Sequence, residues 1–290
     1  MLLGSNTFGL KYDLKKDFAG TILRLKAAGF TAVEICVTGD RQIEEMLACV
    51  PEEKRTAYLD SPFRFAFFPM SEAGERIREI RELGLAVVDM HLSLPGEPDA
   101  ENMAELTQVT IAFLKENGLF GCVVSGMKNL EGTKALAPYL EQMAAELKQA
   151  GFVLMYHNHD IECVPEAGTT AFDYLMEHYP SLSAEPDVGW MVMGGSDPVA
   201  FIRRYKDRIP CLHLKDFAKE NNGADAGEAR FAAIGEGILP LAEVMEAAKE
   251  LKLIDNGLVI DQDASTGDFI EDLKRGKENV ERVVREQAAS

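Results

Sequence analysis

The sequence predicts an α/β protein in which a single (β/α)8 barrel, a TIM barrel, takes up residues 1–290. Two observations favour this fold. An amphipathic helix, a glycine and a short apolar run recur along the chain, a pattern typical of βαβ units with a parallel sheet. The apolar runs number about eight, as a closed barrel requires, and the length of 290 residues is ordinary for one barrel.

The recurring unit is clear near the N-terminus. Phe18, Ile22 and Leu25 share one face of a predicted helix, and Gly29 follows directly before an apolar run. A glycine after a helix is the expected left-handed stop, because it has no Cβ to clash there. The same arrangement returns at Gly84, Gly118, Gly151 and Gly257.

The apolar runs suit strands that are buried on both faces of a parallel sheet. In chain order, the predicted strands are Leu2–Asn6, Ala32–Cys36, Ala86–His91, Cys122–Ser125, Val153–His157, Leu182–Glu185, Cys211–His213 and Leu258–Ile260. One helix start is also marked, since Asp197 offers an N-cap and Pro198 a proline at the first helical position. No glycine-rich dinucleotide fingerprint follows the first strand, so a Rossmann fold is the weaker interpretation.

Residues 40–70 do not fit the recurring unit. The segment is longer than a simple connection between strand and helix, and it contains the aromatic run Phe63–Phe68. Two interpretations stay open: an extra helix with a covering loop packed on the barrel, or a lid or subunit contact built from these aromatics.

Composition restricts the partners and the compartment. The formal net charge is −18, which argues against a nucleic acid and against an anionic membrane surface. No run approaches the roughly 18 apolar residues of a membrane span, and the first residues lack the basic flank of a secretion signal. The five cysteines are scattered and odd in number, so we expect buried apolar residues in a reducing, cytoplasmic compartment, with neither disulfides nor a zinc site among them.

Polar residues gather where the strands of the second half end. Residues at the carboxyl ends of barrel strands face one common mouth, so these side chains should converge. Imidazole and carboxylate groups together suit a divalent ion such as Mn²⁺, Co²⁺, Fe²⁺ or Zn²⁺. The residues concerned are His157, His159, Glu185, Asp187, His213, Lys215, Asp261 and Asp263.

Five fragments carry a resemblance to a known family. They are Tyr156-His157-Asn158-His159-Asp160, Asp187-Val188-Gly189-Trp190, His213-Leu214-Lys215-Asp216, Gly235-Glu236-Gly237 and Asp261-Gln262-Asp263. In this order they resemble the xylose isomerase-like barrel family, the sugar phosphate isomerase/epimerase group, which also includes inosose dehydratases and endonuclease four. The similarity covers essentially the whole chain and is strongest from Gly151 to Asp263.

The resemblance implies one divalent metal held by residues from four strands. Asp187 and His213 match the family's Asp and His ligands, while His157 and Asp261 stand where the family usually has glutamates. If His157 is not a ligand, His159 or Glu162 is the next candidate. Manganese is the expected ion, and cobalt, iron, zinc and magnesium are alternatives.

The implied reaction is a metal-assisted sugar isomerisation or epimerisation that removes a proton next to a carbonyl. His159, Lys215 and Asp261 are the predicted catalytic residues, with His159 as the general base. Trp190, His91, Glu34 and Glu236 are the predicted substrate contacts, and Asp216 is expected to orient His213. For Lys215, an ion pair with Asp216 or Glu185 is the competing interpretation.

Two other functions stay open. A metal-dependent lyase or dehydratase, of the inosose or keto-glycoside type, would share the same proton abstraction. A non-catalytic sugar-binding or partner subunit would result if the changes at His157 and Asp261 abolish metal affinity. The partner is expected to be a small sugar or polyol, and the chain could also form a homo-oligomer, as many barrels do.

Overall fold

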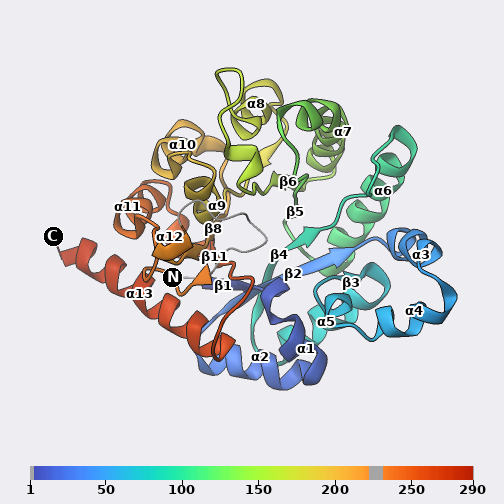
Figure 1. Cartoon of the computed structure of the whole chain (residues 1–290), viewed down its shortest axis with the longest axis horizontal. Helices are drawn as coiled ribbons and strands as arrows, with labels where there is room; N and C mark the ends of the chain where they lie inside the picture. Colours follow the sequence, from blue (N-terminus) through green and yellow to red (C-terminus); the bar gives the residue numbers. More distant parts are fainter. Residues whose placement is uncertain (1–2, 222–230, 290) are drawn as a thin grey trace.

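In the computed structural model, residues 3–221 and 231–289 are described, and they form the predicted barrel. Eight parallel strands follow one another in the order β7-β6-β5-β4-β2-β1-β11-β8, and Figure 1 shows the helices arranged around them. The barrel strands are β1 (Leu3–Asn6), β2 (Ala32–Thr38), β4 (Ala86–Leu92), β5 (Gly121–Val124), β6 (Val153–Tyr156), β7 (Ser183–Ala184), β8 (Leu212–Leu214) and β11 (Leu258–Ile260). All eight predicted strands are therefore confirmed, apart from Leu2, which lies outside the described residues.

The barrel closes between β7 and β8 through a single bridge. Asp187 pairs in parallel with His213, and the His213 amide donates a hydrogen bond to the carbonyl of Pro186 at 3.1 Å. The last contact of the cylinder is thus made by two of the residues that the sequence singles out as metal ligands.

The helices pack on the outside of the cylinder. They are α1 (Lys11–Lys16), α2 (Phe18–Ala27), α3 (Asp40–Cys49), α4 (Glu52–Leu59), α5 (Met70–Glu82), α6 (Ala100–Asn117), α7 (Leu130–Gln149), α8 (Ala171–His178), α9 (Val188–Met193), α10 (Pro198–Arg204), α11 (Leu241–Glu250), α12 (Leu253–Asn256) and α13 (Phe269–Ala289). The predicted start of α10 is confirmed, because the Asp197 carboxylate accepts hydrogen bonds from the amides of Val199 and Ala200. No helix of the described chain is long and apolar enough to cross a membrane.

The expected glycine stops are confirmed at four of the five positions. Gly29, Gly84, Gly118 and Gly151 all have φ between 61° and 91°. Gly257 is different, with φ of −134°. A glycine is needed there for a close approach, since a Cβ would lie 2.7 Å from the carbonyl oxygen of Pro210.

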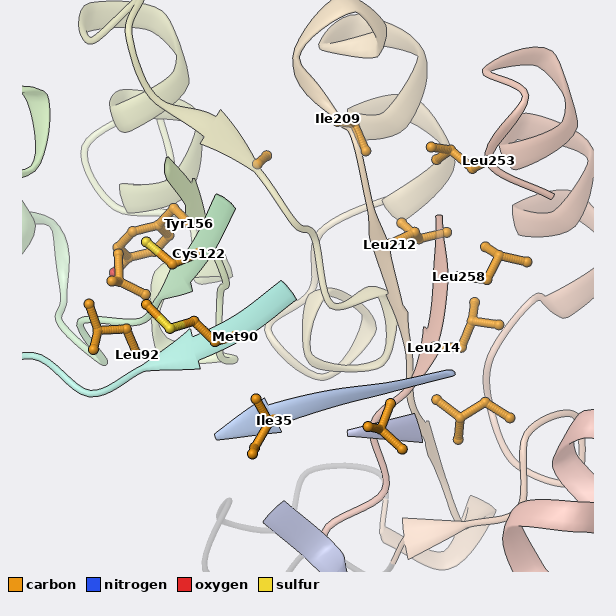
Figure 2. Close-up of a cluster of buried hydrophobic side chains, with 14 of the residues drawn as sticks. Ile35, Met90, Leu92, Cys122, Tyr156, Ile209, Leu212, Leu214, Leu253 and Leu258 are labelled. Carbon is orange, nitrogen blue, oxygen red and sulfur yellow. The ribbon is translucent and has the colours of Figure 1, made fainter. Parts of the chain in front are cut away.

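The core has two layers. The larger one lies between the strands and the helices, and Figure 2 shows part of it, with Leu212, Leu214 and Leu258 from β8 and β11 near Leu253. A smaller apolar cluster, which is separate from the outer layer, comes from β5, β6, β11 and the residue directly before β8; it consists of Val123, Met155, Val259 and Cys211. All five cysteines are free thiols, and four of them are buried while Cys49 is exposed.

The irregular segment at 40–70 contains α3, α4, a short 3-10 turn (Pro62–Phe65) and the two-residue strand β3 (Phe68–Pro69), which pairs with β2. Figure 1 shows α3 and α4 together on the outer right of the barrel. Phe68 is buried in the core, whereas Phe67 lies edge-on to His91, with the ring centroids 6.4 Å apart. The segment therefore sends one aromatic side chain into the core and one towards the barrel mouth.

We predict that Gly121→Ala destabilises the barrel. A Cβ at this position in β5 would lie 2.3 Å from the carbonyl oxygen of Val153 in the neighbouring strand. Strands cannot move apart without loss of ladder hydrogen bonds, so the free energy of unfolding should fall by about 1–3 kcal/mol, as in other overpacked cores. Thermal unfolding measures the change, with Gly96→Ala as the control, because nothing lies within 4 Å of a Cβ at Gly96. Equal melting temperatures for the two variants would contradict the prediction.

Candidate metal centre at the barrel mouth

A cavity of about 400 Å³ opens at the carboxyl ends of the strands. Its lining combines aromatic side chains with imidazole, carboxylate and ammonium groups. The residues are Asn6, Phe8, Cys36, Phe67, His91, Ser125, Met127, His157, His159, Asp160, Trp190, Lys215, Asp261 and Asp263. A second cavity, of about 290 Å³, shares Phe67, His91, Ser125 and Met127 with the first, so the two adjoin.

Four buried side chains meet at the floor of this cavity. His157, Asp187, His213 and Asp261 each place one potential ligand atom within 4.8 Å of the other three. Nε2 of His157 lies 3.4 Å from Oδ2 of Asp187 and 3.5 Å from Oδ2 of Asp261, and Nδ1 of His213 lies 3.2 Å from Oδ2 of Asp261. The four residues whose motifs imply the metal ligands are thus brought together.

The chemistry of this cluster fits a divalent cation. Both ring nitrogens of His157 and Oδ2 of Asp187 are buried and have no hydrogen-bond partner among the described residues. Buried polar atoms left in this state are costly, and the separations of 3.4–3.5 Å are too long for good hydrogen bonds. Two imidazoles and two carboxylates are also a set that suits Mn²⁺, Fe²⁺, Co²⁺ or Zn²⁺ and balances a charge of +2.

Local structure points each group inwards. Two backbone hydrogen bonds continue the strand pairing up to the site. The His157 amide donates to the carbonyl of Val124, and the Asp261 amide donates to the carbonyl of Leu214. Asp187 caps α9, so Oδ1 accepts a hydrogen bond from the Trp190 amide and Oδ2 remains for the site. Gly189 allows the close packing that this turn needs, since a Cβ there would lie 2.4 Å from the carbonyl oxygen of Lys215.

Glu34 and Glu185 orient His213. Nε2 of His213 lies 2.6 Å from Oε2 of Glu34 and 3.0 Å from Oε2 of Glu185, which leaves Nδ1 on the side of Asp261. Burial opposes the charged imidazole, but these carboxylates raise the pKa of His213 well above its ordinary value. Burial likewise opposes the Glu34 carboxylate, yet His213 and His91 lower its pKa to about 2.

This geometry corrects two expectations. Asp216 does not orient His213, because its carboxylate accepts hydrogen bonds from four backbone amides, those of Phe217, Gly235, Gly237 and Leu239. Glu34 is fully buried outside the lining of the cavity, and its carboxylate contacts Asn6, His91 and His213.

A third expectation, for Glu236, is also corrected. Its side chain is exposed and forms an ion pair with Arg275 at 3.1 Å, outside the lining of the cavity. Glu162, the reserve ligand, is also occupied, since it accepts hydrogen bonds from the Tyr156 hydroxyl and from the amides of Lys128 and His159.

Lys215 neutralises the carboxylates of the mouth. Its Nζ lies 3.0 Å from Asp261, 3.1 Å from Asp263 and 3.4 Å from Asp187, so the alternative partners Asp216 and Glu185 are wrong. Burial opposes the ammonium, but the three carboxylates raise the pKa of Lys215 above its ordinary value. Burial raises the pKa of Asp263 to about 6, with Lys215 acting in the opposite direction.

His159 and His91 both face the cavity. Nδ1 of His159 is buried without a hydrogen-bond partner among the described residues, and its ring lies 5.6 Å from that of Trp190. Burial, together with the charges of His157 and Lys215, lowers the pKa of His159 well below its ordinary value, so this imidazole is neutral. Nδ1 of His91 lies 3.3 Å from Oε1 of Glu34.

Several residues of the mouth are absent from the sequence-based prediction. Phe8 lines the cavity, and Asn6 donates a hydrogen bond to Glu34 from the end of β1. No local pattern marks them, because they belong to the first part of the chain, where the strand ends carry few polar motifs. Glu185 is among the polar strand-end residues that the sequence marks, but only the structure shows that it holds His213.

Comparison with known proteins agrees with this architecture. The sequence profile described as a xylose isomerase-like TIM barrel matches residues 22–279. An inosose dehydratase of Lacticaseibacillus casei is 26% identical over 125 residues, which are 40% of this chain and 42% of that protein. This match therefore spans less than half the length of that relative.

Solved structures match over nearly the whole chain. A sugar phosphate isomerase/epimerase from Parabacteroides distasonis superposes with a TM-score of 0.68 at 20% identity, covering 95% of this chain and 92% of that one. The IOLI protein with a bound zinc atom has a TM-score of 0.63 at 12% identity, covering 98% and 96%. At these low sequence identities, the similarity shows that the folds are alike and nothing further.

We predict that Asp216→Asn destabilises the loop between β10 (Phe231–Ala232) and α11. An asparagine has one acceptor oxygen in place of two, so some of the four amides would face an NH2 group instead. Each buried donor left unpaired costs about 1–3 kcal/mol, and we expect a loss of at least about 2 kcal/mol in urea unfolding. Asp207→Asn, at an exposed aspartate, is the control. Unchanged unfolding of Asp216→Asn would contradict this role.

Proposed function

Because the chain belongs to the xylose isomerase-like TIM barrel family, we propose that it is a divalent-metal-dependent enzyme that removes a proton next to the carbonyl of a keto sugar or keto polyol. Isomerisation or epimerisation is the primary proposal for the outcome. The observation that carries the proposal is the buried cluster of His157, Asp187, His213 and Asp261, whose orphaned nitrogen and oxygen atoms match the needs of one cation.

The lining of the mouth supports an uncharged substrate. Lys215 is the only lysine or arginine among the described residues around the cavity, and three carboxylates already share its charge. A phosphate group would find no free cation among these lining residues. Phe8, Phe67 and Trp190 provide apolar walls against which the carbon face of a sugar or cyclitol ring can pack.

The adjoining cavity leaves room for a larger substrate. It continues past Met127 to Lys128, an exposed residue, so a second ring of a glycoside would fit beyond the first. The volume of about 400 Å³ in the main cavity is within the range of small-molecule sites. We therefore propose a free monosaccharide, cyclitol or glycoside as the substrate class.

Each mouth residue has a proposed role. The bound ion would act as a Lewis acid on two neighbouring oxygens of the substrate. His159 would accept the α-proton at its unpartnered ring nitrogen, from a position beside His157 and Trp190. Lys215 would hold Asp261 and Asp263 in place and keep the floor of the site close to neutral.

Elimination is the second candidate for the outcome. It is favoured by the matching relative from Lacticaseibacillus casei, which is an inosose dehydratase. Isomerisation and elimination share the removal of the α-proton and differ in the fate of the resulting enediolate. In elimination a hydroxyl group must leave as water, whereas in epimerisation the proton returns to the opposite face.

We propose that residues 40–70 serve as a partial cover of the mouth within this single domain. Phe67 lines both the main cavity and the adjoining one, while its neighbour Phe68 is buried in the core. A cover with one buried and one cavity-facing aromatic can change substrate access without unfolding the barrel. Formation of a homo-oligomer through this segment stays a prediction.

We predict that His157→Ala lowers the metal content by one equivalent per chain relative to wild type. The alanine removes one of two nitrogen ligands, and the remaining set of His213, Asp187 and Asp261 binds transition metals less tightly. Metal analysis of the purified chains after incubation with Mn²⁺ or Zn²⁺ measures this, and Asp187→Ala should behave in the same way. His178→Ala is the control, because His178 is exposed on α8. Equal metal content in His157→Ala and wild type would contradict the proposed centre. A wild type that takes up no metal at the mouth would instead favour a non-catalytic sugar-binding subunit.

We predict that His159→Gln slows proton exchange without loss of metal. Deuterium uptake from D2O next to the carbonyl of free keto sugars and inososes reports the shared first step of both candidate reactions. The rate should fall by about 10²–10⁴, the usual contribution of a general base. His178→Gln should leave the rate unchanged. An unchanged rate in His159→Gln would assign the base to another residue.

A further inference from the structure

Three buried groups lie below the mouth cluster and take no part in the proposed reaction. Asp89, Glu185 and Cys211 each offer one ligand atom within 4.8 Å of the other two. The exposed fractions are 0% for Asp89, 0% for Glu185 and 3% for Cys211. An exposed cluster of acids is ordinary, but a sealed one with a thiol needs a physical explanation.

These groups form a deeper layer of the same barrel. Each lies two residues before a residue of the mouth: Asp89 before His91, Glu185 before Asp187, and Cys211 before His213. Side chains two positions apart along a strand point the same way and are separated by about 6–7 Å. Along three of its strands, the barrel interior therefore carries two stacked layers of side chains that can bind a metal.

A β-bulge turns Asp89 into the barrel. The pairing of β2 with β4 shifts between Val33, which pairs with Val87, and Ile35, which pairs with Met90. Val87 and Met90 belong to the outer core, while Val88 packs with the inner cluster. The extra residue on β4 thus allows Asp89 to share the inner side with Val88, and bulges often re-aim a side chain in this way.

Asp89 has no hydrogen-bonding partner in the described part of the chain. Both carboxylate oxygens are buried, and neither has a hydrogen bond or an ion pair among the described residues. A buried charge without a partner is strongly unfavourable. Burial, together with the neighbouring carboxylates of Glu185 and Glu34, raises the pKa of Asp89 well above its ordinary value, so either a proton or a bound cation would relieve this charge.

The neighbouring groups cannot supply the missing positive charge. Glu34 and Glu185 are both acidic, and His213 already contacts Glu34, Glu185 and Asp261. Among the described residues, none therefore offers Asp89 a positive charge that is not already shared with other carboxylates. A bound cation would satisfy Asp89 and Glu185 together.

We propose that Asp89, Glu185 and Cys211 bind a second divalent ion, one that accepts a thiolate ligand such as Zn²⁺, inside the barrel below the mouth. Thiolate and carboxylate ligands together favour zinc or cobalt over magnesium and manganese. Ligand atoms around zinc are about 3.5 Å apart, a spacing that the cluster reaches with small side-chain shifts. The thiol proton leaves to solvent on binding.

The second ion would also stiffen the mouth. Glu185 belongs both to this deep cluster and to the pair of carboxylates that hold His213. An ion on Glu185 would therefore fix the orientation of His213 from below. The proposal does not rest on the mouth centre, because none of its three ligands is a ligand of that centre.

Cobalt loading tests the thiolate ligand directly. We expect Co²⁺ added to the metal-free full chain to give a sulfur-to-cobalt charge-transfer band in the near ultraviolet. The band should persist in His157→Ala, which affects only the mouth, and disappear in Cys211→Ser and in Asp89→Asn. Cys36→Ser is the matched control, because Cys36 lines the mouth cavity. No band in wild type, or a band lost in Cys36→Ser and kept in Cys211→Ser, would overturn the proposal.

Metal content separates this site from the proposed function. With both sites filled, wild type holds two zinc ions, while His157→Ala and Cys211→Ser each hold one. One ion in wild type that remains in His157→Ala and is lost in Cys211→Ser would support the deep site and contradict the mouth centre. One ion that is lost only in His157→Ala would do the reverse.

Stability gives a readout that does not depend on spectroscopy. Asp89→Asn removes an unpaired buried carboxylate, so the metal-free variant should melt at or above the temperature of metal-free wild type. Added Zn²⁺ should raise the melting temperature of the double variant Asp89→Asn, His157→Ala less than that of His157→Ala. An equal rise in both would overturn the deep site, and circular dichroism of the metal-free variants verifies that both are folded.

Discussion

The pairing of Asp187 with His213 is the contact on which the site depends. A row of parallel strands becomes a cylinder only when its two edge strands meet, and here they meet through this one bridge. The same bridge sets two imidazole and carboxylate side chains next to each other at the mouth. Barrel closure and assembly of the candidate metal centre are therefore one event, and the metal would stabilise the seam that creates its own site.

Burial of charge is the second constraint. The interior holds Glu34, Asp89, Glu185, Asp187 and Asp261, all almost fully removed from solvent. Among the described residues, His157, His213 and Lys215 each face more than one of these carboxylates directly. Such an excess of buried acid is unfavourable unless protons or bound cations offset it, and a metal at the mouth would supply part of this positive charge.

The errors in the sequence-based site have one cause. Asp216 and Glu236 lie in family-like motifs beside the correct strands, yet one binds the amides of a loop and the other an arginine on the surface. Glu34 lies at a strand position that faces the interior, where its carboxylate is fully buried against His213 and His91. A sequence motif indicates at which end of a strand a residue lies. It does not indicate how deeply the side chain is buried or which backbone amides surround it.

The sequence by itself determined the alternation of strands and helices, the closed parallel barrel and the group of polar residues at its mouth. Those features result from local periodicity, from glycine stops and from the rule that parallel strands end on one rim. Only the tertiary structure decided that Glu34 and Glu185 orient His213, that Lys215 serves three aspartates, and that a bulge turns Asp89 inwards. These contacts join residues far apart in the chain, and their distances depend on strand register and barrel closure, which no local pattern encodes.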